Sequence, residues 1–376
     1  MFINKKEFNN RIYGLDMLRS IAILFVLIAH TTTFVTGKVS HPLTITGFYG
    51  VEFFFVLSGF LIGTILIKIH HKEPNTSIKS IKAFWIRRWF RTLPNYYLML
   101  FIYMALYFVT KHVLLVLDIN YLAYFVFLQN TFSPQPDFYN ISWSLSIEEW
   151  FYLIFPILLF SYQGFQKNKR KSVVYTVATI ILFCLVGRII IALNQKELDW
   201  DGWFRKLMPL RLDGIAFGVL AAYLKFYYQS IWVKYKSLFA CIGILLLSIV
   251  FVVVYNDVVL NTNSLNISFF SKTFLFTINS LAVALLLPFV YDIKTNSRYL
   301  TYLVTIISLI SYSIYLVHPL VIGILSKLGL KNALGVILLW VITIIISYFQ
   351  YSLFESRITK IRDRLTDKSN SINVLS

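Results

Sequence analysis

Arg19 and His30 stand at the two ends of an apolar stretch near the start of the chain, "RSIAILFVLIAH". Nine apolar residues and one serine separate them. Eleven residues make about three helical turns, so in a helix both side chains project from one face, roughly 16 Å apart along the axis. An ionisable side chain in lipid is costly unless it faces protein, water or a ligand. The spacing therefore predicts one molecule held at two depths along this helix.

Arginines interleaved with aromatic residues follow in "WIRRWFRTLP" at 85–94. Arg87, Arg88 and Arg91 permit two interpretations. In the first, the segment is an interfacial amphipathic helix whose cations touch lipid headgroups. In the second, the forked guanidinium donors bind a phosphate-rich ligand that arrives from the cytosol. The sequence leaves both open.

The composition that surrounds these residues is that of an integral membrane protein. Of 376 residues, 58% are hydrophobic and 14% are charged, against about 25% charged in soluble domains. We predict an all-α, polytopic membrane protein with about ten transmembrane helices. The predicted spans are 15–35, 47–68, 92–114, 143–162, 173–193, 208–225, 237–255, 271–291, 300–325 and 333–354.

The positive charges orient these spans. With the N-terminus inside, 24 of the 35 Lys and Arg residues fall in cytoplasmic segments, as the positive-inside rule requires. Both termini are therefore predicted to be cytoplasmic. The same topology accounts for most of the net charge of +18, so no nucleic-acid partner is expected. We assign residues 1–355 to one transmembrane domain and residues 356–376 to a polar cytoplasmic tail.

Most other ionisable residues inside the spans fall in the outer half of the membrane when the spans are aligned by direction. They indicate a polar cavity facing the outside, lined by histidines, carboxylates and arginines. The alternative is that they form interhelical salt bridges and interfacial anchors near helix ends. The set comprises His30, Glu52, Glu148, Glu149, Arg188, Arg211, Asp213 and His318.

A histidine and carboxylates in an outer cavity, with arginines at the inner mouth, suit acyl transfer across the membrane. The arginines would hold the phosphates of an acyl-coenzyme A, whose pantetheine arm would reach toward His30. His30 would act as general base on an acceptor hydroxyl, oriented by a carboxylate for which Glu148 is preferred to Glu52. No G-x-S-x-G nucleophile motif occurs, which favours direct transfer over a covalent intermediate. Acyl-CoA is expected as a co-substrate, with no metal site and no tightly bound cofactor.

Six motifs in order make the sequence resemble the acyltransferase-3 superfamily, bacterial multi-pass membrane O-acyltransferases of surface polysaccharides. Arg19 and His30 are similar to the family's Arg-x10-His motif. Trp143, Ser144 and Glu148 match its Trp-Ser-Leu-x-x-Glu block. The other four are "GVEFFFVLSGFLIG" at 50–63, "RRWFRTLPNYY" at 87–97, "RLDGIAFG" at 211–218 and "ISYSIYLVHPL" at 310–320.

The resemblance implies transfer of an acetyl or other short acyl group from cytosolic acyl-CoA to a hydroxyl of an extracytoplasmic carbohydrate. O-antigen, an exopolysaccharide or a lipid-linked precursor would be such an acceptor, and the bacterial cytoplasmic (inner) membrane would be the location. It also implies that His30 is essential as a catalytic residue, and that Arg19 and the basic motif (Arg87, Arg88, Arg91) serve the donor. Further cavity or acceptor residues are expected to be Glu52, Trp143, Ser144, Arg188, Arg211, Asp213 and His318.

Two other classes of protein stay open. A secondary transporter or exporter would suit ten spans and a polar outer cavity, but the sequence has no internal repeat and no paired broken helices near the midplane. An accessory membrane protein without chemistry would leave the shared face of Arg19 and His30 unexplained. The identity of the acyl group and of the acceptor sugar is not fixed by the sequence.

Overall fold

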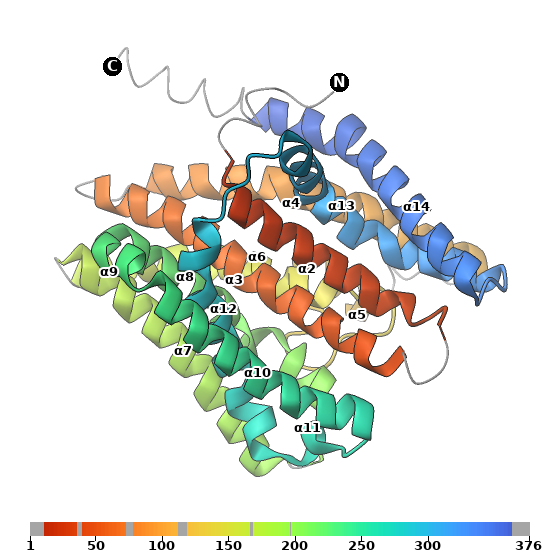
Figure 1. Ribbon diagram of the computed structural model, residues 1–376, viewed down its shortest axis with the longest axis horizontal. Helices are drawn as coiled ribbons and strands as arrows, with labels where there is room; N and C mark the ends of the chain where they lie inside the picture. Colours follow the sequence, from red (N-terminus) through yellow and green to blue (C-terminus); the bar gives the residue numbers. More distant parts are fainter. Residues whose placement is uncertain are drawn as a thin grey trace.

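The computed structural model describes residues 11–35, 40–72, 78–111, 119–165, 168–195 and 197–362. Within these ranges the chain consists of helices and connecting turns, and no strand occurs (Figure 1). Nine helices in them are long and apolar enough to cross a membrane. They are α2 (Tyr13–Thr31), α3 (Ser40–Lys72), α4 (Ile78–Lys111), α6 (Ser142–Phe165), α7 (Lys169–Asn194), α10 (Lys236–Leu260), α12 (Phe269–Tyr291), α13 (Arg298–Lys327) and α14 (Ala333–Gln350). The prediction of an all-α, multi-pass membrane protein is confirmed.

The sixth predicted span corresponds to a shorter helix, α8 (Leu212–Tyr227). Its 16 residues cover about 24 Å, less than the roughly 30 Å of a bilayer core. The first two turns of α8 are buried among the other helices, so a short helix suffices there. Each of the ten predicted spans thus has a helix. The predicted cytoplasmic location of the termini stays a prediction, because residues 1–10 and 363–376 lie outside the described ranges.

Helices α3 and α8 form the most extensive helix pair of the described chain. Glycines permit this contact: a Cβ atom at Gly59 would lie 1.9 Å from the carbonyl oxygen of Ile215, and one at Gly218 would lie 2.0 Å from that of Val56. Any side chain at either position would therefore separate the two backbones. Small residues at helical spacing serve such close approaches in membrane helices.

Helix α2, which carries Arg19 and His30, lies between α3 and α13 (Figure 1). Its buried side chains include Ala22, Ile23 and Val26, which are almost inaccessible to solvent. Because α2 is embedded on both sides, the face that bears the arginine and the histidine points into the protein rather than into lipid. This position meets the expectation that both residues face protein or a ligand.

Two connecting segments cover the start of α6. The first comprises α5 (Ile119–Leu122), the 3₁₀ turn η2 (Ala123–Val126) and residues 127–141; the second comprises the π turn η3 (Trp200–Arg205) and the 3₁₀ turn η4 (Met208–Leu210). The side-chain amide of Asn130 joins them, because it donates to the carbonyl oxygens of Trp143 (3.1 Å) and Lys206 (2.7 Å). Helix α6 therefore begins below the surface of the protein.

The remaining short elements are α9 (Gln229–Lys234), α11 (Ser264–Ile267) and a π turn η5 (Tyr351–Glu355). After η5 the chain stays helical to residue 362, which is past the predicted domain boundary at 355. The rest of the predicted polar tail, residues 363–376, lies outside the described residues.

Candidate functional site

A cavity of about 100 Å³ lies between α2, α3, α4, α6 and α13. Arg19 reaches it from α2, Arg88 and Arg91 from α4, and Glu148 from α6. We call this space the arginine cavity. Four residues were predicted to bind the donor, and three of them, Arg19, Arg88 and Arg91, lie together in this cavity. The fourth, Arg87, is exposed and does not line it.

The three arginines of this cavity are half-buried, and Glu148 shares the cavity with them. Among the described residues, Arg19, Arg88 and Arg91 form no ion pair. The Arg88 guanidinium instead lies over the Tyr152 ring, 5.7 Å from its centre. Because guanidinium groups suit carboxylate and phosphate oxygens, this arrangement is prepared for an anionic ligand.

A chain of hydroxyl groups holds Glu148 in the arginine cavity. The Tyr152 hydroxyl donates to Oε2 of Glu148 at 2.7 Å, and the Ser58 hydroxyl lies 2.7 Å from the same tyrosine oxygen. Glu148 and Tyr152 are one helical turn apart on α6, so their contact follows from helix geometry. The neighbouring Glu149 accepts a hydrogen bond from the Thr92 hydroxyl at 2.6 Å and is turned toward α4.

A second and larger cavity, of about 510 Å³, lies around His30 and is called the histidine cavity here. Its walls come from α2, α3, α6, α10, α11, α13 and the two segments that cover the start of α6. Both aromatic and polar side chains line it, among them Phe48, Asn140, Trp143, Trp200, Arg205 and Asp257. Of the predicted acceptor residues, Trp143 lies here, whereas Ser144 lines the arginine cavity.

The His30 ring has a defined orientation. Its Nδ1 atom lies 2.8 Å from the carbonyl oxygen of Val26, one turn earlier on α2. A carbonyl can only accept, so Nδ1 carries a proton, and in the neutral imidazole Nε2 then keeps its lone pair. The His318 ring packs edge-on at 4.7 Å between ring centres, and its own Nδ1 donates to Ile314. His30 therefore presents Nε2 as a hydrogen-bond or proton acceptor.

A charged cluster forms one wall of the histidine cavity. Asp201 pairs with Arg205 at 2.7 Å and with Lys206, and the Arg205 guanidinium lies 5.2 Å from the centre of the Trp143 ring. Burial opposes ionisation of Asp201, but the adjacent cations of Arg205 and Lys206 outweigh it and hold the pKa of its carboxyl below the ordinary value. Asp201 therefore stays ionised and fixes both cations at the wall.

The arginine and histidine cavities meet at two residues, since Val51 of α3 and Tyr315 of α13 line both. Tyr315 is anchored there by its hydroxyl, which lies 2.6 Å from the Ser144 hydroxyl and donates to the carbonyl oxygen of Ile141 at 3.0 Å. The two cavities are therefore adjoining compartments along the face of α2 that carries Arg19 and His30.

The structure corrects one prediction: Glu148 does not orient the His30 imidazole. Glu148 lines the arginine cavity and bonds to Tyr152, whereas the imidazole bonds to a backbone carbonyl and packs on His318. The depth estimate placed Glu148 in the outer layer because it is near the start of α6. That start is itself buried under the covering segments, so six residues further along, about 9 Å, the chain is already at the depth of the arginines.

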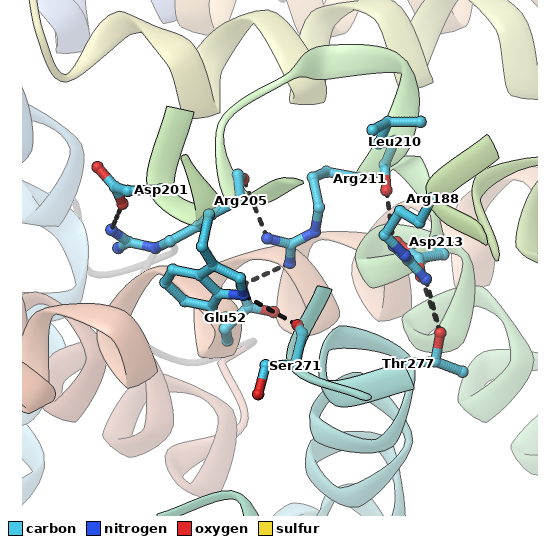
Figure 2. A network of polar contacts seen from close by, with 10 residues as sticks. Glu52, Arg188, Asp201, Arg205, Leu210, Arg211, Asp213, Ser271 and Thr277 are labelled. Atoms are coloured by element: carbon cyan, nitrogen blue, oxygen red, sulfur yellow. Dashed lines mark hydrogen bonds and ion pairs between the residues drawn. The ribbon is translucent and has the colours of Figure 1, made fainter. Parts of the chain in front are cut away.

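Four other predicted cavity residues pair with one another instead of lining either cavity (Figure 2). Glu52 accepts from Arg211 at 2.6 Å, and Asp213 accepts from Arg188 at 2.6 Å. All four side chains are at most 1% exposed. The sequence left open whether these residues line a cavity or form interhelical salt bridges, and these four form salt bridges. His318 is likewise buried and contacts the site through the rings of His30 and Tyr315.

Several lining residues were not singled out from the sequence. Tyr315 lies inside the quoted motif "ISYSIYLVHPL", three residues before His318, and a helical turn between them could have indicated it. Asp201 and Arg205 have the spacing of a helical ion pair in "DGWFR". The segment was interpreted as an external connection, in which no helical pair was expected. No local pattern marks Tyr152 apart from the other tyrosines of the chain.

The comparison with protein families gives one match that covers most of the chain. The Acyltransferase domain family matches residues 12–351, and this chain belongs to that family. The match includes α2 with Arg19 and His30, the basic segment of α4 and the start of α6. The resemblance drawn from the motifs is therefore confirmed. No solved structure gave a significant match to the chain.

Curated relatives share part of the sequence. The peptidoglycan O-acetyltransferase OatA of Listeria monocytogenes is 35% identical over 173 residues, which cover 42% of this chain and 25% of that protein. A Bacillus subtilis protein, YrhL, provisionally named a peptidoglycan O-acetyltransferase, is 32% identical over 196 residues, or 48% of this chain and 28% of its own. A Staphylococcus aureus protein provisionally named an O-acetyltransferase is 35% identical over 167 residues. The matched stretches span about a quarter of the length of these relatives.

Proposed function

We propose that this protein is a membrane O-acetyltransferase that moves an acetyl group from cytosolic acetyl-CoA to a hydroxyl group of an extracytoplasmic carbohydrate. The observation that carries the proposal is the adjacency of the two cavities along one face of α2. Arg19 lies in the first cavity and His30 in the second, and the two share Val51 and Tyr315. Family membership supports acyl transfer as the reaction class.

The donor would bind at the arginine cavity. Arg19, Arg88 and Arg91 have no ion pair among the described residues, so a phosphate-bearing ligand would give them partners. A cavity of about 100 Å³ is too small for a nucleotide, since ligand pockets usually measure about 300 Å³ or more. We therefore expect the adenosine to stay at the mouth while the phosphates and the pantetheine arm enter.

The acceptor would enter the histidine cavity. Trp143 and Trp200 offer aromatic faces, and Asn140 and Arg205 offer hydrogen-bond donors, which together suit a carbohydrate. Nε2 of His30 would take the proton of the acceptor hydroxyl as its oxygen attacks the thioester carbonyl carbon. The carbon–sulfur bond then breaks, the acetyl group remains on oxygen, and the coenzyme A thiol receives the proton.

The choice of acceptor starts from the relatives. Two of them carry names that specify peptidoglycan, so glycan strands of peptidoglycan are the first acceptor to test, beside O-antigen, exopolysaccharide and lipid-linked precursors. The bacterial cytoplasmic membrane is the location that such a reaction needs, because the donor is cytosolic and the acceptor is outside.

Transfer across a sealed membrane tests the proposal. Proteoliposomes would enclose labelled acetyl-CoA and receive glycan outside, with wild type, His30→Ala and His41→Ala compared. His41 is exposed on α3 and lines neither cavity, so it is the matched control. We expect labelled glycan with wild type and His41→Ala, and a loss of roughly 10²- to 10⁴-fold with His30→Ala, the usual contribution of a general base. Equal acetyl transfer by all three proteins contradicts the role of His30. Labelled acetyl-CoA that appears outside the vesicles without any labelled glycan points to a transporter.

A further inference from the structure

The two cavities share two lining residues, one of them a valine and the other a tyrosine. Val51 and Tyr315 are the residues that line both, and each is less than a tenth exposed, at 6% and 7%. Val51 contributes two methyl groups from α3, and Tyr315 contributes its ring from α13. We call this pair the neck.

Both sides of the neck are held in place. A β-branched valine in a helix has one strongly preferred rotamer, so the methyl groups of Val51 have little freedom to turn away. The Tyr315 hydroxyl is tied to Ser144 and to the carbonyl oxygen of Ile141, and moving the ring would break both contacts. Unsatisfied hydrogen-bonding groups are costly in a buried site, so the neck resists widening.

From these contacts we propose that the neck of Val51 and Tyr315 determines which acyl group the protein transfers, by admitting short, unbranched chains and excluding larger ones. The inference rests on the proposed function. An acyl thioester anchored by phosphates at Arg88 and Arg91 presents its acyl end first, because the nucleotide stays at the mouth. The acyl group must therefore pass the neck before its carbonyl carbon can reach His30.

The neck also disfavours acyl groups that carry a charge. Its surface consists of valine methyl groups and a tyrosine ring whose hydroxyl already has partners. A carboxylate at the end of the acyl chain, as in a succinyl group, would lose its water there without gaining a hydrogen bond. Size and polarity thus select in the same direction, toward acetyl.

The test uses a valine that differs from Val51 only in position. Val56 lies on the same helix, is fully buried and lines neither cavity. Acetyl-CoA and butyryl-CoA would be compared as donors for wild type, Val51→Ala and Val56→Ala in the proteoliposome assay. One methylene in an apolar pocket changes kcat/KM by about 10-fold or more, so Val51→Ala should raise the butyryl-to-acetyl ratio at least about tenfold, and Val56→Ala should leave it unchanged.

A variant with a larger side chain at position 51 separates an effect on the choice of acyl group from an effect on folding. Val51→Ile adds a methylene at the neck and should lower acetyl transfer while leaving the affinity for acetyl-CoA unchanged. An unchanged ratio in Val51→Ala, or an equal rise in Val56→Ala, overturns the neck even though wild type transfers acetyl. Absence of transfer by wild type and every variant contradicts the proposed function itself, and the neck with it.

Discussion

Two groups of arginines within the helix bundle have different surroundings. Arg188 and Arg211 are fully buried, and each pairs with a carboxylate from another helix (Figure 2). Arg19, Arg88 and Arg91 line a cavity and form no ion pair among the described residues. The sequence makes both groups look alike, as cations within apolar stretches. Their partners distinguish a group that pairs with carboxylates across helices from one for which we propose a ligand.

The paired group connects helices that are distant in sequence. Arg188 of α7 contacts Asp213 of α8 and also the Thr277 hydroxyl of α12 at 2.7 Å, while Arg211 reaches Glu52 of α3. The Arg211 guanidinium also lies 4.0 Å from the centre of the Phe276 ring. Because each guanidinium pairs with a carboxylate of another segment and neither pair lines the arginine or the histidine cavity, this network connects the helices.

The largest effect that separates the two groups should be on stability. Removing one member of a buried pair leaves an uncompensated charge, which costs about 3–5 kcal/mol. Asp213→Ala should therefore strongly lower the thermal stability of the purified protein. Asp292→Ala is the control, because its pair with Lys236 is more than a third exposed, and such pairs contribute less than about 1 kcal/mol. Equal stability of the two variants would contradict a fastening role for the buried pair.

A smaller and more selective effect is expected for the cavity group. Hydrogen bonds to charged groups contribute about 1.5–3 kcal/mol, so Arg91→Ala should weaken acetyl-CoA binding roughly 10- to 100-fold. Stability should fall less than in Asp213→Ala, because Arg91 forms no ion pair among the described residues. Arg87→Ala, in the same segment but exposed and outside the cavity, should bind as wild type does. Titration calorimetry of the three proteins decides, and matched losses at Arg87 and Arg91 would favour the lipid-headgroup interpretation of the segment.

The helices and the face shared by Arg19 and His30 could be predicted because both depend on local sequence. Apolar stretches long enough for a membrane mark each helix, and eleven residues at helical pitch place the two side chains on one face. The predicted start of the second span was less accurate than the predicted existence of the helices. Helix α3 begins at Ser40 instead of 47, so Glu52 lies about three turns inside it rather than near its outer end.

The partners of the charged residues could not be predicted, because they depend on contacts between distant segments. Glu148 meets the arginines of α2 and α4 only because two segments bury the start of α6. The neck likewise joins Val51 and Tyr315, which are far apart in the chain. Counting residues along each helix predicts the depth of a side chain in the membrane, but it does not predict which neighbouring helix that side chain contacts.

The central claim is that one ligand, held by the arginines, reaches His30 through the neck. Diethyl pyrocarbonate added outside sealed proteoliposomes modifies accessible histidines, and mass spectrometry can compare His30 with His41. Acetyl-CoA enclosed at ten times its Kd should slow modification of His30 roughly tenfold by occupancy, with His41 unaffected. The protection should disappear in a variant that combines Arg88→Ala with Arg91→Ala. Modification of His30 at the same rate with and without acetyl-CoA would contradict a ligand that spans both cavities.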